Sequence, residues 1–245
     1  MIELTITPME PRENVRAYVY RLLYHNIMAV RLTPGTAVSE QEVSSYLDIS
    51  RTPVREAFIH LSQDGLVEIL PQRGTFVSKI DTALIEENRF MRLTLERAVI
   101  RLACQELPDM YLKQYDQSLN DQKEAMDAGD SARFMTLDNE MHGIIFAGCG
   151  KPHVWQTLMQ ANLDYLRSRA LSVLNTEEMD IVYAKHQSLV THIRQHETDQ
   201  AERDINEHID RIIIDLAALR AAHPDFFQMM RDPSAILHES GDNDD

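Results

Sequence analysis

Four polar side chains interrupt apolar helical stripes in the second half of this sequence and carry its clearest chemical potential: Asp138, His142, His186 and His208. Asp138 and His142 are four residues apart, so they lie on one face of a helix. Burying a carboxylate and three imidazoles without partners would cost several kcal/mol. The simplest interpretation is that the four side chains meet around one divalent cation. Three imidazoles and one carboxylate favour zinc, nickel, manganese, iron or cobalt over calcium or magnesium.

Other interpretations of these residues stay open at this point. A histidine on an apolar stripe is usually a core residue with a hydrogen-bond partner, and Asp138 could pair with an arginine. His192 and His196 form a rival helical pair, but they point off the stripe and precede the loop "ETD", so we predict that they are solvated. A metal site could also activate water in a hydrolase. The sequence, however, has "NEMHG" in place of an HExxH motif.

A second distinctive stretch is "ISRTPVREAFIHL", residues 49–61, in which two arginines lie four residues apart. Thr52 can cap a helix and Pro53 suits its first position, which places Arg51 just outside the helix and Arg55 in its first turn. That end of a helix carries positive partial charge, so cations there are unfavourable unless something negative docks against them. Phosphates and the guanine edge of DNA are the obvious partners, and solvated arginines are the alternative.

The surrounding elements predict a winged helix-turn-helix in residues 1–78. An amphipathic helix is expected over 15–30, and a capping-box signal at Ser39 opens a short second helix. The third helix, which carries the two arginines, should stop at Gly65. Two short β-rich runs then flank a turn at 71–74. Three helices followed by a hairpin are typical of this fold.

Residues 79–222 are predicted to form an antiparallel all-α bundle of six or seven helices, because strand signals vanish from Asp81 onward. The fourth of these helices is opened by Pro152 and should reach Leu174. The fold class is therefore mainly α. Residues 223–245 are expected to be an acidic C-terminal tail.

Composition limits the function classes. The net charge is −15, with −2 in residues 1–78 and −13 in the rest, so an acidic body carries a near-neutral head that can approach DNA in one orientation only. No apolar stretch is long enough for a membrane span, and the first residues lack the order of a signal peptide. Cys104 and Cys149 fit no metal or redox spacing. These features predict a cytoplasmic protein with no membrane partner.

The stretch "PGTAVSEQEVSSYLDISRTPVREAFIHLSQDGLVEILPQRGTFV" resembles the DNA-binding head of the GntR family of bacterial transcription regulators. The resemblance implies that Arg51 and Arg55 read the major groove of a double-stranded operator and that Thr52 holds a phosphate. The wing tip, Arg73 and Gly74, would enter the minor groove.

The body resembles the ligand-binding FCD domain of the FadR subfamily of these regulators. The matching segments are "RLTLE" at 92–96, "DNEMH" at 138–142, "KHQSLVTHI" in the fifth helix and "EHI" at 207–209. In the metal-binding branch of that subfamily, one Asp and three His ligate the cation. The resemblance therefore implies a metal site, with zinc as the first candidate, held by Asp138, His142, His186 and His208.

The same resemblance implies a place for an effector. Arg92 looks like the family arginine that faces the cavity and meets a carboxylate ligand. A surface salt bridge from Arg92 to Glu96, one helical turn further on, is the alternative. Lys185 stands where relatives often carry an acidic residue, so an outer partner of the metal site is expected to be missing or replaced.

The two resemblances imply a ligand-responsive transcription regulator and not an enzyme. A homodimer on a pseudo-palindromic operator is expected, because helix-turn-helix heads usually pair on half-sites about one helical turn apart. A small organic acid, with sugar acids as one candidate class, would complete the coordination of the metal and change how the heads are spaced. The alternatives are a metal-dependent hydrolase and a regulator whose helical body only dimerises, with the four polar residues as a hydrogen-bonded core.

Overall fold

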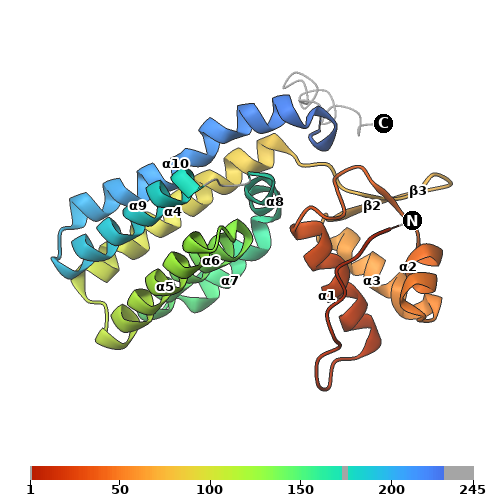
Figure 1. Cartoon of the computed structure of the whole chain (residues 1–245), viewed down its shortest axis with the longest axis horizontal. Helices are drawn as coiled ribbons and strands as arrows, with labels where there is room; N and C mark the ends of the chain where they lie inside the picture. Colours follow the sequence, from red (N-terminus) through yellow and green to blue (C-terminus); the bar gives the residue numbers. More distant parts are fainter. Residues whose placement is uncertain (1, 173–175, 229–245) are drawn as a thin grey trace, which may run out of the picture.

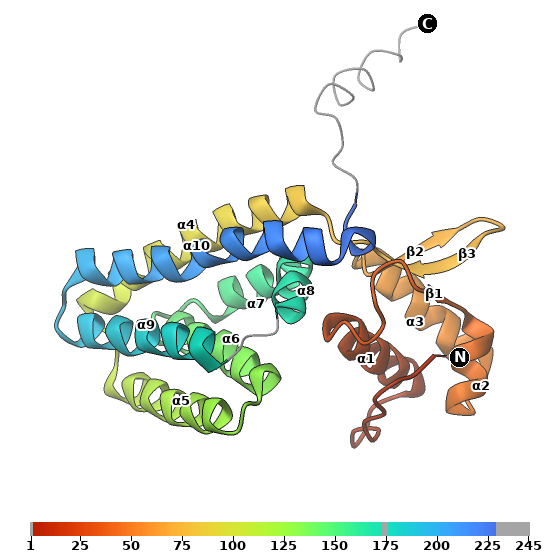
Figure 2. The same cartoon turned by 45° about the horizontal axis from the view of Figure 1, so that its top comes forward.

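The structure, a computed structural model, describes residues 2–172 and 176–228. An N-terminal head and a larger helical body lie side by side (Figure 1; Figure 2). The head consists of three helices and a small sheet, which confirms the predicted winged helix-turn-helix. Its elements are α1 (Val15–Met28), β1 (Ala37–Val38), α2 (Glu40–Leu47), α3 (Arg51–Gln63), β2 (Val67–Leu70) and β3 (Gly74–Val77).

Helix α3 begins at Arg51, so the prediction that Thr52 caps it is wrong. Ser50 is the N-cap residue, with extended backbone and no side-chain hydrogen bond to the helix amides. Pro53 is tolerated in the first turn because its missing N–H has no intrahelical acceptor there. The consequence is that Arg51 and Arg55 both belong to the helix and lie one turn apart.

Strands β2 and β3 form the wing, an antiparallel hairpin in which Leu70 lies opposite Gly74. The sequence did not predict β1, which pairs with the other edge of β3 and places Ala37 opposite Phe76. The wing turn needs left-handed backbone at Gln72, with φ 60°, and at Gly74, with φ 108°. Glycine adopts the second of these at no steric cost. The hairpin projects from the head away from the body (Figure 1).

The body contains seven α-helices among the described residues, which agrees with the predicted bundle. They are α4 (Thr82–Gln105), α5 (Asp109–Asp127), α6 (Ser131–Gly148), α7 (Pro152–Ala161), α8 (Leu163–Leu171), α9 (Thr176–Arg194) and α10 (Thr198–Ala222). None of the described helices is long and apolar enough to cross a membrane.

The single helix expected from Pro152 to Leu174 is in fact two helices, α7 and α8, which meet at Asn162. The break has a packing reason. Leu158 before it lies in the core of the body, whereas Leu163 after it packs against the core of the head. The end of the expected helix, Leu174, lies outside the described residues.

Helix α8 also holds the segment that joins head and body, residues 78–81. The Asp164 carboxylate accepts a hydrogen bond of 3.0 Å from the backbone N–H of Asp81. The guanidinium of Arg167 donates to the carbonyl of Ser78 at 2.7 Å and forms an ion pair with Asp164. Arg167 is fully buried, so this junction is a fixed part of the interior.

The first residues of the predicted acidic tail, 223–245, are ordered against the same junction. A short 3₁₀ helix, Pro224–Phe226, follows α10. The backbone N–H of Ile80 donates to the carbonyl of Phe226 at 2.9 Å, and Phe227 is buried beside it. Residues 229–245 lie outside the described part of the chain.

Candidate metal centre and nucleic-acid interface

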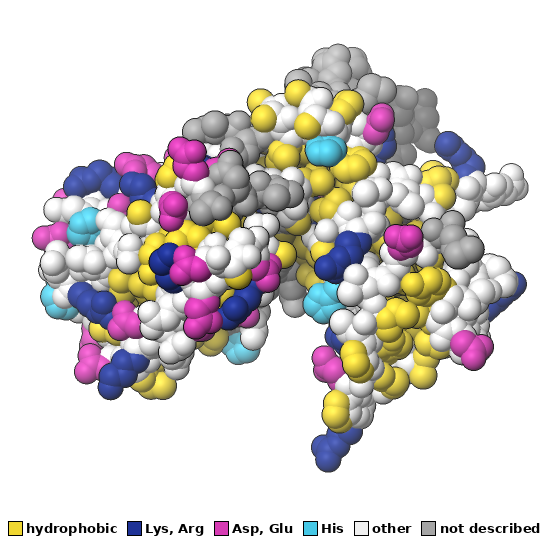
Figure 3. Space-filling model, viewed as in Figure 1, with side chains coloured by type: hydrophobic (Ala, Val, Ile, Leu, Met, Phe, Trp, Pro, Cys, Tyr) yellow, Lys and Arg dark blue, Asp and Glu magenta, His cyan; other side chains and the backbone are white. Residues whose placement is uncertain are grey.

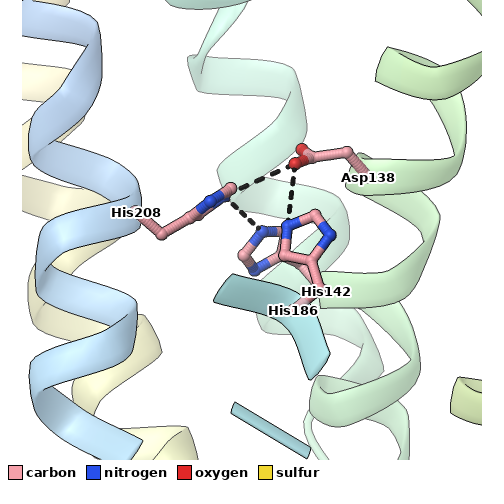
Figure 4. A group of neighbouring side chains, drawn as sticks. All are labelled: Asp138, His142, His186 and His208. Atoms are coloured by element: carbon pink, nitrogen blue, oxygen red, sulfur yellow. Dashed lines mark hydrogen bonds and ion pairs between the residues drawn. The ribbon is translucent and has the colours of Figure 1, made fainter. Parts of the chain in front are cut away.

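The four polar residues singled out in the sequence converge between three helices of the body (Figure 4). Asp138 and His142 project from α6, His186 from α9 and His208 from α10 (Figure 4). One donor atom from each lies within 4.8 Å of the others. Asp138 Oδ1 is 3.2 Å from His186 Nε2 and 3.4 Å from His208 Nε2. The Nε2 atoms of His142 and His208 are 3.1 Å apart.

The donor set fits a transition metal. Asp138 Oδ1 and His186 Nε2 are buried and have no hydrogen-bond partner within the described part of the chain. Polar atoms left in that state are costly, and a shared cation would satisfy both. Two atoms bound to one cation at about 2.1 Å lie no more than about 4.2 Å apart. Three of the separations, 3.1, 3.2 and 3.4 Å, fall inside that limit, whereas the full set of donor atoms is bounded by 4.8 Å.

Side-chain oxygens next to two of the histidines determine which ring nitrogen is free to bind a cation. His142 Nδ1 is 2.5 Å from Glu96 Oε2, and His186 Nδ1 is 2.7 Å from Gln122 Oε1. Gln122 Oε1 accepts a hydrogen bond from His186 Nδ1, and the Glu96 carboxylate beside His142 Nδ1 favours a proton there, so Nε2 of each ring is left as the ligand atom. Burial alone would raise the pKa of Glu96, but His142 and Arg92 hold that pKa below its ordinary value, so Glu96 is an ionised acceptor.

Asp138 is ionised because Arg169 compensates its charge. Arg169 Nη1 donates to Asp138 Oδ2 at 2.8 Å, which leaves Oδ1 facing the histidines. Burial alone would raise the pKa of Asp138, yet the nearby Arg169 guanidinium holds it well below its usual range. Burial lowers the pKa of His186 and His208, so both rings are neutral at neutral pH, as metal binding requires.

Arg92 on α4 is completely buried beside the cluster. Its Nε donates to Glu96 Oε1 at 2.5 Å, so the pairing weighed as an alternative exists, but in the interior and not on the surface. Nη1 and Nη2 are buried and lack a hydrogen-bond partner among the described residues. The guanidinium carbon lies 5.2 Å from the ring centroid of Tyr165 and 5.8 Å from that of Trp155. Unpaired guanidinium donors in such surroundings suit a carboxylate ligand.

Sequence reasoning missed Gln122, the outer partner of His186. Lys185 forms an ion pair with Glu207 instead of supporting the cluster. Gln122 lies on α5 and is fully buried, although α5 contributes no ligand. Its signal was a polar residue on the buried face of α5, the same signal that identified the ligands themselves. Extending the search to every helix would have found it.

The rival pair, His192 and His196, takes no part in the cluster. His192 Nδ1 is 2.7 Å from a carboxylate oxygen of Asp204, and His196 Nδ1 is 2.7 Å from the carbonyl of Cys104. Both imidazoles therefore have protein partners, which the prediction of solvated rings did not include.

The five residues predicted to contact DNA are all exposed on the head: Arg51, Thr52, Arg55, Arg73 and Gly74. The first three occupy the start of α3, and the last two form the tip of the wing. The ion pairs described in the head use Arg16 and Arg21 instead. No side chain caps α3, so its first amides have no side-chain acceptor, and the neighbouring Arg51 and Arg55 are exposed.

A winged helix-turn-helix that exposes cations at its recognition helix, joined to a helical body, is the architecture of a DNA-binding transcription regulator. Residues 16–77 match the gntR family of bacterial regulatory proteins, and residues 89–211 match the FCD domain. The chain belongs to the GntR family and is a DNA-binding transcription regulator, not an enzyme.

Individual relatives agree with this assignment. The chain is 30% identical to the HTH-type transcriptional repressor RspR of Escherichia coli K12 over 221 residues, which covers 90% of this chain and 97% of that protein. It is 25% identical over 202 residues to the HTH-type transcriptional repressor NanR of Cronobacter sakazakii, which covers 74% and 76%. The solved structure of Escherichia coli McbR/YncC shares the fold, with a TM-score of 0.70, 18% identity, and coverage of 86% of this chain and 99% of that one.

Replacing exposed arginines of the head tests whether α3 or the wing recognises the base sequence of the operator. Arg55→Ala is expected to lose roughly 1–3 kcal/mol of specific operator binding, because a recognition helix reads bases. Arg73→Ala is expected to lose less and to lower the salt dependence by about one phosphate contact. Operator affinity measured across salt concentrations checks both, with Arg133→Ala on the exposed body as the control. Greater loss of base discrimination from Arg73→Ala would mean that the wing is the reading element.

Replacing the outer partner of His186 tests the metal centre without touching a ligand. Gln122→Leu removes the oxygen that fixes the Nδ1 proton, so metal affinity is expected to fall about 10- to 100-fold. Competition against a chelator of known affinity measures this. Gln117→Leu, an exposed change on the same helix, is the control. Unchanged metal affinity in Gln122→Leu would contradict the assignment of His186 as a ligand.

Proposed function

We propose that this regulator senses a small carboxylate at a divalent metal held by Asp138, His142, His186 and His208. Zinc is the first candidate, and nickel, manganese, iron and cobalt suit the same donors. When bound, the metal supplies a Lewis-acid site for a carboxylate oxygen. Arg92 is the residue proposed to bind the same carboxylate from the side.

The observation that carries this proposal is that two sets of buried polar atoms lack hydrogen-bond partners and lie close to each other. On one side, Asp138 Oδ1 and His186 Nε2 lack hydrogen-bond partners among the described residues. On the other, Arg92 Nη1 and Nη2 also lack them. A metal satisfies the first set and an anionic ligand the second, since buried charged groups need compensation. The sugar-acid class expected from the sequence stays a prediction.

Helix α8 offers a physical route from this site to the head. Tyr165 lies beside the Arg92 guanidinium, and Arg169 holds Asp138. On the same short helix, Asp164 and Arg167 hold the junction between head and body. A ligand that moves Tyr165 or Arg169 therefore acts on the junction through a single rigid element.

The proposed regulator works as a cytoplasmic homodimer on a pseudo-palindromic operator. Its relatives RspR and NanR are named as repressors, which supports a repressor that the carboxylate releases from DNA. A body that only dimerises would leave the unpaired Arg92 donors without a purpose. The membership of the GntR family removes the hydrolase alternative.

Removing one ligand tests the coupling of metal and effector. His208→Ala is expected to lose the metal and to lower the Tm of the metal-loaded protein by roughly 5–15 °C. Operator binding without effector should survive in part, because the head contains no ligand, whereas the response to carboxylates should vanish. Elemental analysis, thermal melts and operator titrations with gluconate and acetate measure these effects. His153→Ala, an exposed change, is the control. A His208→Ala protein that keeps its metal or its full response contradicts the proposal.

A change at the junction tests the route through α8. Arg167→Met removes the bond to the Ser78 carbonyl and is expected to reduce the effect of the carboxylate on operator affinity at least about threefold, with metal content unchanged. Asp164→Asn, a milder change in the same contact, should shift the response in the same direction. Arg101→Met, with an exposed side chain, is the control. A folded Arg167→Met protein with the full response would rule out this route.

A further inference from the structure

A cavity of about 580 Å³ lies between α1 of the head and helices α6, α7 and α8 of the body. The surface is indented between the body and the head in Figure 3. The head contributes Tyr24 and Met28 to the cavity wall, and the body contributes Met135, Trp155 and Leu166. Its volume is in the range of about 300–1,000 Å³ that is usual for small-molecule sites.

This cavity shares wall residues with the metal centre. Trp155 lines it, and the indole ring centroid lies 6.1 Å from that of His142 and 5.8 Å from the Arg92 guanidinium carbon. Arg169 also lines it and binds Asp138 at 2.8 Å. Met135 on α6 lines it too, and its Sδ atom accepts from Arg169 Nη2 at 3.4 Å. The cavity is therefore next to the place where the proposed carboxylate binds.

The chemistry of the wall selects a class of ligand. The wall contains six large apolar side chains: Tyr24, Met28, Met135, Trp155, Met159 and Leu166. Its polar residues include Ser131, Thr136 and Asn139, together with the exposed Arg31 and Glu140. Methionine side chains adapt their shape to apolar ligands. Against the aromatic rings and thioethers, the hydroxyl groups of a sugar acid would lose water without gaining partners, and only the part of the wall with Ser131, Thr136 and Asn139 offers them hydrogen bonds. A hydrocarbon or aromatic group has no hydrogen bonds to water to lose, and its transfer out of water is favourable.

We propose that this cavity receives the apolar body of the effector, and that the effector is a carboxylic acid with an aliphatic or aromatic body of about six or more carbons. This inference rests on the proposed function, because the acid group is the one held beside Arg92. The apolar body would contact Tyr24 and Met28 of α1, so the ligand would touch both head and body. Occupation of the cavity then alters directly how the head is held.

Four probes test the class in the full-length, zinc-loaded protein: acetate, octanoate, 4-phenylbutyrate and gluconate. Trp155 is the single tryptophan of the chain, so its fluorescence reports binding at the shared wall. Burial of each methylene strengthens binding by about fourfold, so octanoate and 4-phenylbutyrate are expected to bind at least about tenfold more tightly than acetate or gluconate. The same two acids should weaken operator binding. Equal or tighter binding of gluconate overturns the inference.

Filling the cavity supplies the matched comparison. Ala132 on α6 lines the cavity and its side chain is exposed, so Ala132→Phe occupies the space without disturbing the core. Its expected effect is loss of the tenfold advantage of octanoate, with acetate binding unchanged. Ala128→Phe, an exposed alanine outside the cavity wall, should leave both unchanged. Octanoate binding that Ala132→Phe does not weaken overturns the inference.

One further variant separates this inference from the proposed function. If Ala132→Phe weakens octanoate binding but His208→Ala does not, the cavity binds apolar acids, and the proposal that the metal holds the carboxylate is wrong. If acetate binding requires His208 while octanoate gains no advantage, the metal-held carboxylate stands and the cavity assignment fails.

Discussion

The need to compensate charge inside a helical bundle shapes the body of this regulator. Asp138, His142 and His186 are almost completely buried, and so are Arg92 and Glu96 beside them. Groups of this kind cannot be left alone in an apolar interior. Asp138, His142 and His186 each have one partner from a neighbouring helix, and Arg92 is paired with Glu96 on its own helix. Donor atoms of the ligand residues that remain face one another. The proposed metal and carboxylate are the species that would complete that arrangement.

The same requirement ties the site to the rest of the molecule. Arg169 must reach Asp138, and it does so from α8, a helix that exists only because the chain breaks at Asn162. The break also carries Leu163 to the core of the head and Arg167 to the junction. The nine residues of α8 therefore do two things: they compensate the charge of one buried carboxylate, and they attach the head to the body. A change at either end of α8 has a direct mechanical path to the other.

Periodicity and turn chemistry were enough to predict the order of elements and the four clustered side chains. A histidine at a position where a stripe demands an apolar residue is a strong local signal. What the sequence could not supply depended on contacts between distant segments. The break at Asn162 reflects packing against the head, and β1 is a two-residue strand that exists only because β3 lies beside it. Thr52 looked like a cap because of its type, but Ser50 precedes it and takes that position.

The residues that contact the proposed metal ligands from outside the cluster were equally hard to predict from the sequence. Glu96 was visible as a helical neighbour of Arg92, yet its contact with His142 joins two different helices. Whether an Arg–Glu pair faces water or the interior depends on which helices cover it. The unpaired donors of Arg92 could be recognised only once those neighbours were in place.

Metal content is the measurement that tests the central claim most directly. The full-length protein, purified without chelator and without added metal, should contain about one equivalent of zinc or another first-row transition metal per chain, and Asp138→Asn should lose it. The contradicting result is a folded wild-type protein that holds less than about a tenth of an equivalent, even after dialysis against zinc, nickel, manganese, iron and cobalt.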